Sequence, residues 1–201
     1  MKANPNLRIG IVAFGDYCDM ESATRFGKAY QCLPLTDDQK KIIDFITNAK
    51  STGGGDGDEF YELVIKKITE ETNWREGSVK SVLLIADAEP HRVGYSYGSI
   101  VNNAQINWRE EAIKAAGLGI SFDTLSIHGY KWYEELSQIT DGIYAPFSSS
   151  SKTSQLVEAA AYSRGGDVTK EVFCKSMLKE ETSGDAEMAR TYNAFSKKIL
   201  H

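Results

Sequence analysis

The sequence predicts an α/β fold, with a doubly wound, mainly parallel sheet and helices on both of its faces. Short β-branched apolar runs alternate along the chain with longer stretches whose apolar residues recur at helical spacing. This alternation is typical of strands joined by crossover helices, which make a parallel, helix-covered sheet. In addition, carboxylates follow the ends of predicted strands, where ligands bind in open parallel sheets.

Five segments are predicted to be strands because they are short and apolar. The first, Leu7–Phe14, ends at the turn signal Gly15–Asp16. The strongest, Val79–Ala86, ends at Asp87. Pro34 lies within the second strand, which is therefore predicted at a sheet edge, because proline cannot donate to a ladder. In order, the predicted strands are Leu7–Phe14, Lys28–Leu35, Val79–Ala86, Gly119–Ile127 and Gly142–Phe147.

The predicted helices carry apolar residues at a spacing of three to four. Thr36 is expected to start the first, because threonine is a good N-cap and Asp37–Asp38 favour the positive end of the helix dipole. The apolar face of this first helix is Ile42, Ile43, Phe45 and Ile46. Further along the chain, a loop is expected over Tyr95–Ile100. The later helices are predicted over Phe60–Thr72, Asn103–Ala116, Tyr130–Ile139 and Ser151–Ser163.

The last part of the chain, Asp167–His201, is predicted to be a helical extension of a domain that covers residues 1–166. Val168–Lys179 and Asp185–Leu200 are predicted to be helices, with a break at Ser183–Gly184 between them. Two roles are open for this tail: it packs on the domain, or it binds a partner. Packing is the expectation, because the second helix has one continuous apolar face. That face consists of Met188, Tyr192, Phe195 and Ile199.

Composition argues against several function classes. The chain has 201 residues and a net charge of −5, and this negative charge argues against a nucleic-acid partner. No apolar run is long enough to span a bilayer. Residues 1–6 contain no apolar stretch of a signal peptide, so a cytoplasmic location is expected, although a piece of a secreted protein would look the same. The three cysteines are too few and too scattered for a disulfide framework or a zinc cluster.

A glycine-rich acidic loop precedes the helix predicted over Phe60–Thr72. Consecutive glycines let the backbone turn tightly and approach a ligand closely. The carboxylates that follow would repel a phosphate, and they suit a hard cation such as Mg²⁺ or Ca²⁺. The alternative is a solvated loop in which Asp58 caps the helix. The loop contains the glycines Gly53, Gly54 and Gly55 and the acids Asp56, Asp58 and Glu59.

Three separate parts of the chain are predicted to bring carboxylates to one edge of the sheet. Asp16 follows the first strand, Asp87 follows Val79–Ala86, and the glycine-rich loop precedes a helix. Clustered oxygen ligands favour Mg²⁺ or Ca²⁺. The alternative for Asp87 is a turn residue or a helix cap. His91 follows Asp87 by four residues and is expected to hydrogen-bond within its loop, because a site of oxygen ligands does not need imidazole.

These residues resemble the motifs of the von Willebrand factor A (vWA) domain. The resemblance covers roughly residues 7–164 and rests on LRIGIVAFGDYCD, on STGGGDGDE before a helix, and on VLLIADAEPH. It is strongest to the domains of hemicentin-like and alpha-kinase-associated proteins, and it extends to the inserted domain of integrin beta subunits. It implies a doubly wound sheet with a metal-ion-dependent adhesion site.

The resemblance also implies a set of ligands. Asp87 matches the acidic ligand after the family's fourth strand, and Thr52 or Glu59 matches the ligand from the loop before the helix. Asp16, Asp56 and Glu59 also resemble the ligands of the neighbouring calcium site in integrin beta subunits. Mg²⁺ or Ca²⁺ is thus expected, weakly bound, at Asp16, Thr52, Asp56, Glu59 and Asp87. The surrounding binding loop is expected to include Gly53, Gly54, Gly55, Asp58 and His91.

One departure from the family concerns its first central strand, which ends in Asp-x-Ser-x-Ser. That motif does not occur in this chain. The sheet is therefore expected to lack the central strand between Leu7–Phe14 and Val79–Ala86, and the adhesion site to lack half of its ligands. Three explanations stay open: Met1 is an internal start of a longer protein, a second chain supplies the strand, or the site has decayed.

Two function classes follow from these motifs. The first is a non-enzymatic protein-binding module whose metal accepts an acidic side chain from a partner protein. The second is a metal-dependent hydrolase or phosphoryl-transfer enzyme that uses Asp16 and Asp87. The binding module is preferred, because the sequence shows no nucleophile or general base with an orienting partner.

Overall fold

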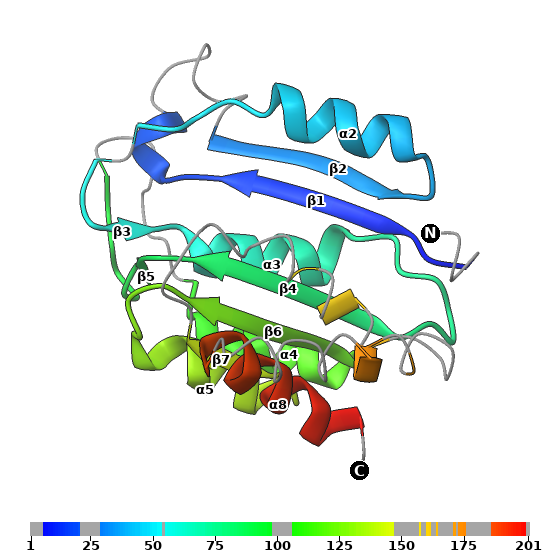
Figure 1. The fold of residues 1–201 in the computed structure, drawn as a ribbon. Helices are drawn as coiled ribbons and strands as arrows, with labels where there is room; N and C mark the ends of the chain where they lie inside the picture. Colours follow the sequence, from blue (N-terminus) through cyan, green and yellow to red (C-terminus); the bar gives the residue numbers. More distant parts are fainter. Residues whose placement is uncertain are drawn as a thin grey trace. The chain divides into compact units, whose positions relative to one another are not determined.

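The computed structural model describes residues 6–20, 29–53, 55–97, 106–146, 157, 160–161, 164, 171, 173–175 and 186–199. The chain forms two compact units, and each is described by itself. Unit 1 consists of Met1–Pro5, Val79–Asp87 and Gly119–His201. Unit 2 consists of Asn6–Ser78 and Ala88–Leu118. Figure 1 shows the helices and strands of both units.

Unit 1 is built on a three-stranded parallel sheet in the order β4–β6–β7. The strands are β4 (Lys80–Ala86), β6 (Ile120–Ser126) and β7 (Tyr144–Pro146). Lys80 lies opposite Ile120, and the pairing continues without a shift to the ends of β4 and β6. Helix α5 (Lys131–Ile139) connects β6 to β7. The predicted mixed α/β fold with a parallel sheet is therefore confirmed.

Helices cover both faces of this sheet, as the neighbours of two successive β6 residues show. The hydroxyl of Thr124 donates to the Tyr133 carbonyl of α5. Leu125 lies in an apolar cluster with Met188 and Phe195 of helix α8 (Ala186–Ile199). Successive strand residues point to opposite faces, so α5 and α8 cover opposite sides.

The predicted packing of the tail is confirmed for α8. Met188 is 1 % exposed, Tyr192 4 % and Phe195 0 %, and all three belong to the core of unit 1. The side chain of Ile199 lies outside the described residues. So do most of the helices predicted over Ser151–Ser163 and Val168–Lys179.

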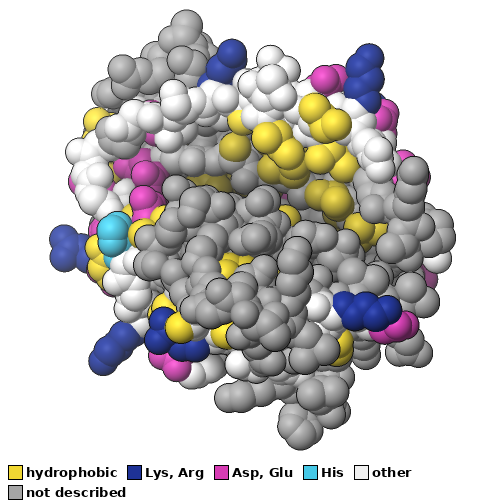
Figure 2. Space-filling view, in the orientation of Figure 1, with side chains coloured by type: hydrophobic (Ala, Val, Ile, Leu, Met, Phe, Trp, Pro, Cys, Tyr) yellow, Lys and Arg dark blue, Asp and Glu magenta, His cyan; other side chains and the backbone are white. Residues whose placement is uncertain are grey.

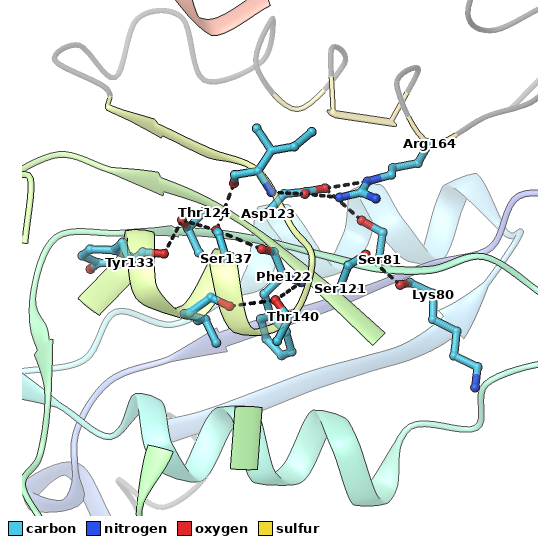
Figure 3. A network of polar contacts seen from close by, with 12 residues as sticks. Lys80, Ser81, Ser121, Phe122, Asp123, Thr124, Tyr133, Ser137, Thr140 and Arg164 are labelled. Atoms are coloured by element: carbon cyan, nitrogen blue, oxygen red, sulfur yellow. Dashed lines mark hydrogen bonds and ion pairs between the residues drawn. The ribbon is translucent and has the colours of Figure 1, made fainter. Parts of the chain in front are cut away.

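A buried carboxylate lies near the middle of β6 (Figure 3). Asp123 is fully buried and forms a two-pronged ion pair with Arg164. Its oxygens also accept the hydroxyl of Ser81, at 3.1 Å, and the backbone N–H of Ile143, at 2.9 Å. Four donors therefore satisfy this buried charge, and Asp123 links β6 to β4 and to Arg164.

Unit 2 begins with an antiparallel pair of strands, β1 (Ile9–Phe14) and β2 (Tyr30–Thr36). Among the described residues β2 pairs only with β1, which confirms the edge position predicted from Pro34. The register shifts between Ile9 and Ile11, opposite the stretch of β2 that contains Pro34. The missing N–H of proline accounts for a ladder that is irregular at this point.

The N-cap of helix α2 (Gln39–Asn48) lies two residues later than predicted. Asp38 is its N-cap, and its carboxylate accepts from the N–H groups of Lys40 and Lys41. The hydroxyl of Thr36 instead accepts the N–H of Asp38. The predicted apolar face of α2 is only partly covered, because Ile43 is 62 % exposed and Ile46 63 % exposed.

The rest of unit 2 contains α3 (Tyr61–Glu71), α4 (Trp108–Gly117) and a short parallel pair. That pair joins β3 (Asp58–Glu59) to β5 (Glu89–Pro90) and was not predicted. Asp58 therefore lies in a strand, and the residue at the N-cap of α3 is Phe60, without a side-chain cap. Among the described residues, no helix combines the length and apolar character needed to cross a membrane.

Candidate metal centre

The centre of unit 2 is a pair formed by Asp16 and His91. Asp16 follows β1 and precedes the short helix η1 (Tyr17–Met20), and His91 directly follows β5. His91 Nε2 lies 2.5 Å from Asp16 Oδ1. Asp16 is fully buried and His91 is 2 % exposed. Two chain segments 75 residues apart therefore meet through a short, buried, charge-assisted hydrogen bond.

A second carboxylate joins this pair from the glycine-rich loop. One ligand atom from each of Asp16, Asp56 and His91 lies within 4.8 Å of those of the other two. Asp56 is exposed, but both of its oxygens have partners: Oδ1 accepts the N–H of Asp58 and Oδ2 accepts the hydroxyl of Tyr95, each at 3.0 Å. These donors orient the carboxylate and leave further lone pairs for a cation.

Two tyrosine rings flank the imidazole of His91. The Tyr95 ring stacks on it with centroids 3.7 Å apart, and the Tyr17 ring is tilted at a centroid distance of 5.4 Å. The hydroxyl of Tyr17 continues inward and donates to Glu62 Oε1 at 2.8 Å. Glu62 Oε2 accepts the backbone N–H of His91 at 3.2 Å. The ring and the backbone of His91 are therefore both fixed by neighbours.

Burial determines the protonation of two groups beside the pair. Burial raises the pKa of Glu62 to about 7, although the hydrogen bond from Tyr17 opposes this rise. Burial, together with the nearby charge of Asp16, raises the pKa of the Cys18 thiol to about 12. Cys18 is therefore a neutral thiol at physiological pH and a poor nucleophile.

The pKa of His91 responds to opposing effects. Burial alone would lower it, but the hydrogen bond and charge of Asp16, with the charges of Glu62 and Asp56, raise it above its ordinary value. The imidazole thus lies in a strongly negative environment. A proton on the ring or a bound cation relieves the repulsion among these carboxylates.

The glycines allow the loop to lie against η1. Asp19 Oδ1 accepts the N–H of Gly53 at 2.9 Å, which ties the loop to the short helix. A Cβ on Gly55 would lie 3.0 Å from the Cys18 sulfur, and a Cβ on Gly15 would lie 2.5 Å from the Thr52 Cβ. A larger residue at Gly15 or Gly55 would therefore push the loop, and Asp56 with it, away from Asp16.

The structure brings together some of the predicted ligands. Asp16 and Asp56 lie together as expected, whereas the ring of His91 hydrogen-bonds to Asp16 and not within its own loop as expected. Thr52 packs against Gly15, Glu59 pairs with Pro90 in the β3–β5 ladder, and Gly54 lies outside the described residues. Asp87 follows β4 in unit 1, so its approach to the other carboxylates stays a prediction.

Sequence reasoning placed His91 in the binding loop but did not predict that its ring contacts Asp16. The strand that precedes His91, β5, has only two residues and therefore no periodic pattern for the sequence to show. The preference of hard cations for oxygen favoured a hydrogen-bonding role for His91.

Two buried atoms of the cluster have unmet bonding capacity. Among the described residues, neither Asp16 Oδ2 nor His91 Nδ1 has a hydrogen-bond partner. Buried polar atoms without partners are unusual and point to a missing ion or water. A divalent cation bound to Asp16 Oδ2 and Asp56 would satisfy the Asp16 atom and neutralise the carboxylates, so the residues present fit a metal.

Comparison with known proteins adds no assignment: no protein-family model matches the chain, and no curated protein has a similar sequence.

Proposed function

We propose that this chain is a non-enzymatic protein-binding module of the vWA type. In this proposal unit 2 holds a divalent cation, and an open coordination position on that cation accepts a carboxylate from a partner protein. The observation that carries the proposal is the convergence of Asp16, Asp56 and His91 within 4.8 Å. Three protein ligands leave positions open on an ion that takes six or more, and water or a partner fills them.

Two features of the chain support a module of this type. The parallel order β4–β6–β7, with helices on both faces, is compatible with the doubly wound sheet that the vWA resemblance implies. The glycine-rich loop lies against η1 and presents the exposed Asp56 at the surface of unit 2. A partner side chain can therefore reach the site from solvent.

The surface charge is compatible with a protein partner. Lys and Arg side chains of the described residues are scattered over the face drawn in Figure 2, and they do not form a continuous basic patch there. Nucleic-acid binding depends on clustered basic residues that neutralise phosphates. The negative charge beside the site also calls for a bridging cation before an acidic ligand can approach.

The proposal is tested by selection from a displayed library of random short peptides, with the chain immobilised in the presence of Mn²⁺. We expect the selected peptides to share an aspartate or glutamate, and to be released by a chelator. An Asp56→Asn chain should retain few of them. Asp44→Asn is the matched control, because Asp44 is an exposed acid on α2 and its loss changes the net charge equally.

Two results would contradict the proposal. One is the selection of peptides without a shared acidic residue. The other is binding that persists after chelation or is unchanged in the Asp56→Asn chain.

A second candidate function is favoured by the Asp16–His91 pair itself. A histidine whose Nε2 is held by a carboxylate, with Nδ1 left without a partner, is the arrangement of a general base. In this alternative the chain is a metal-dependent hydrolase or phosphoryl-transfer enzyme that uses its rim carboxylates. Hydrolysis of p-nitrophenyl phosphate or acetate that Mn²⁺ stimulates and His91→Gln abolishes would support the enzyme over the binding module.

A further inference from the structure

We propose that the partner docks as an extended strand on the edge of β1 that faces away from β2. In this arrangement the partner's backbone pairs with Val12 and Phe14, and an acidic side chain at the end of its strand reaches the ion beside Asp16. The inference rests on the proposed function and deepens it, because it names the conformation in which the partner is recognised and the part of unit 2 that recognises it.

The first step of the argument is that β1 has the sequence of an interior strand. The segment Ile9–Phe14 contains no charged residue and no proline. Successive strand residues point to opposite faces, so Ile11 and Ala13 place apolar side chains on one face, and Val12 and Phe14 on the other. A continuous apolar run of this kind is typical of a strand that is buried on both faces.

The second step is that the burial of β1 does not match its sequence. No residue of β1 is fully buried, whereas six of the seven residues of β6 are. Strand β6 pairs with a strand on each side, but β1 pairs only with β2 among the described residues. Figure 2 shows hydrophobic side chains gathered on the surface where Figure 1 draws β1 and β2. A further strand would therefore cover apolar surface that β1 leaves exposed.

The third step concerns the protection of sheet edges. An edge strand exposes unpaired N–H and C=O groups, and proteins generally protect such edges with proline, charged side chains or bulges. Strand β2 has Pro34, and the ladder is irregular between Ile9 and Ile11. From Ile11 to Phe14 the register is regular, and β1 carries none of these protections. This stretch is thus suited to accept another strand.

The fourth step identifies the groups that are available. Gly15, directly after β1, donates its N–H to the Ala29 carbonyl at 3.0 Å. In an antiparallel pair, residues that bond to the neighbouring strand alternate with residues that do not. Ala13 therefore bonds to β2, whereas the N–H and C=O groups of Val12 and Phe14 point to the opposite edge. Another extended backbone matches such a row of donors and acceptors, so the row defines the class of occupant.

The fifth step connects this edge to the candidate metal centre. Asp16 lies two residues beyond Phe14, and one of its carboxylate oxygens is within 4.8 Å of a ligand atom of Asp56. A strand advances by about 3.3 Å per residue. A partner strand that extends one or two residues past Phe14 therefore ends beside Asp16. Backbone pairing then contributes affinity, and the terminal acid makes binding depend on the ion.

Hydrogen exchange of single amides, measured by nuclear magnetic resonance on the ¹⁵N-labelled full chain with Mg²⁺, tests this proposal. The probes are two synthetic peptides of alternating valine and threonine, one with aspartate at its carboxyl end and one with aspartate at its amino end, because the added strand can run in either direction. In the free chain, Val12 and Phe14 should exchange faster than Ala13. A saturating peptide should slow both by roughly tenfold or more.

Methylation of one peptide amide at a time provides a second measurement, with its own controls. Only alternate amides of an extended strand face β1. Methylation should therefore weaken binding at every second position, by roughly fivefold or more for each lost hydrogen bond. The positions between them are the matched controls. Replacing the terminal aspartate with asparagine should remove the dependence of binding on Mg²⁺, while high concentrations of the peptide should still protect Val12 and Phe14.

The outcomes separate this inference from the proposed function. Acidic peptides that need the ion but leave exchange at Val12 and Phe14 unchanged would overturn strand docking and leave metal-dependent binding standing. Protection that is equal with Mg²⁺ and with a chelator, and equal for aspartate and asparagine, would support strand docking and contradict the proposed function. Slow exchange of both amides in the free chain would show that the edge is already covered, which would overturn the inference.

Discussion

Glu62 shows how one buried residue couples the candidate site to pH. It is 1 % exposed, and its two oxygens accept from the Tyr17 hydroxyl and the His91 backbone N–H. Neither donor carries a full charge, so these two hydrogen bonds offset only part of the loss of hydration of the carboxylate. The pKa of Glu62 is therefore raised from 4.5 to about 7.

This shift predicts a loss of stability as pH rises. A group whose pKa is higher in the folded chain stabilises the fold below its unfolded pKa, and that contribution disappears as pH rises through the folded value. Glu62 should thus lower the free energy of unfolding between about pH 4.5 and 7, by about 3 kcal/mol in total at 1.36 kcal/mol per pKa unit. The raised pKa of His91 acts in the same direction.

Urea unfolding at pH 5 and pH 8, with a chelator present, measures this dependence. Glu62→Gln should be less sensitive to pH than the wild type, because the amide does not titrate. The glutamine side chain can replace both hydrogen bonds of Glu62, because its oxygen can accept from the His91 N–H and its amide can donate to the Tyr17 hydroxyl. Glu70→Gln, on the exposed side of the same helix, is the control. Equal pH dependence in the wild type and Glu62→Gln would show that the buried carboxyl does not control stability.

At the scale of elements, α8 shows that the tail belongs to the core of unit 1. Phe195 is fully buried, and the Tyr192 ring stacks on Phe173 at a centroid distance of 5.3 Å. These contacts join the helix to Leu125 and Ala145 of the sheet in one apolar cluster. Burial of this kind is the main stabilising contribution to a domain of this size.

Removing one of these rings should destabilise the fold. Phe195→Ala is expected to lower the free energy of unfolding by about 3–5 kcal/mol, through lost transfer energy and the cavity left behind. Asn193→Ala, at an exposed position two residues away on α8, should change it by less than about 0.5 kcal/mol. Denaturant midpoints with matched slopes provide both numbers. A Phe195→Ala chain as stable as the wild type would mean that α8 is not part of the core in solution.

Much of the fold could be predicted at this scale because periodicity is a local property. The strand over Val79–Ala86 and the helix over Phe60–Thr72 lie within one residue of β4 and α3 at each end. The pair β3–β5 was missed, because two-residue strands have no period and depend on partners distant in sequence. The start of α2 was misplaced because Thr36 and Asp38 are both good caps, and sequence alone does not show which one the chain uses.

For the candidate site, a residue's place in the predicted fold was a better guide to its membership of the cluster than its residue type. Asp16 was identified because it follows a buried strand, and Asp56 because it lies on a glycine-rich loop. Their proximity depends on two contacts that hold the loop against η1: the hydrogen bond from the Gly53 N–H to Asp19 and the close approach of Gly55 to Cys18. Each contact joins residues more than 30 positions apart. No local pattern indicates those contacts. Ligand chemistry placed His91 in the binding loop and not among the predicted ligands, and the structure brings its ring close to Asp16 and Asp56.

At the scale of the whole molecule, the candidate ligands Asp16, Asp56 and His91 all belong to unit 2. The parallel sheet and the predicted ligand Asp87 belong to unit 1. The account therefore makes metal binding a property of unit 2, for which Asp87 is not required. This separation distinguishes it from the site that the vWA resemblance implies.

The central claim is that Asp16, Asp56 and His91 hold a divalent cation, and calorimetric titration of Mn²⁺ into the full chain tests it most directly. Asp56 is the informative position because it is exposed, so Asp56→Asn should fold normally. The account predicts that the wild type binds one ion, that Asp56→Asn binds it roughly tenfold more weakly or worse, and that the control Asp44→Asn binds it as the wild type does. Equal affinity in the wild type and Asp56→Asn, or no heat of binding in either, would contradict it.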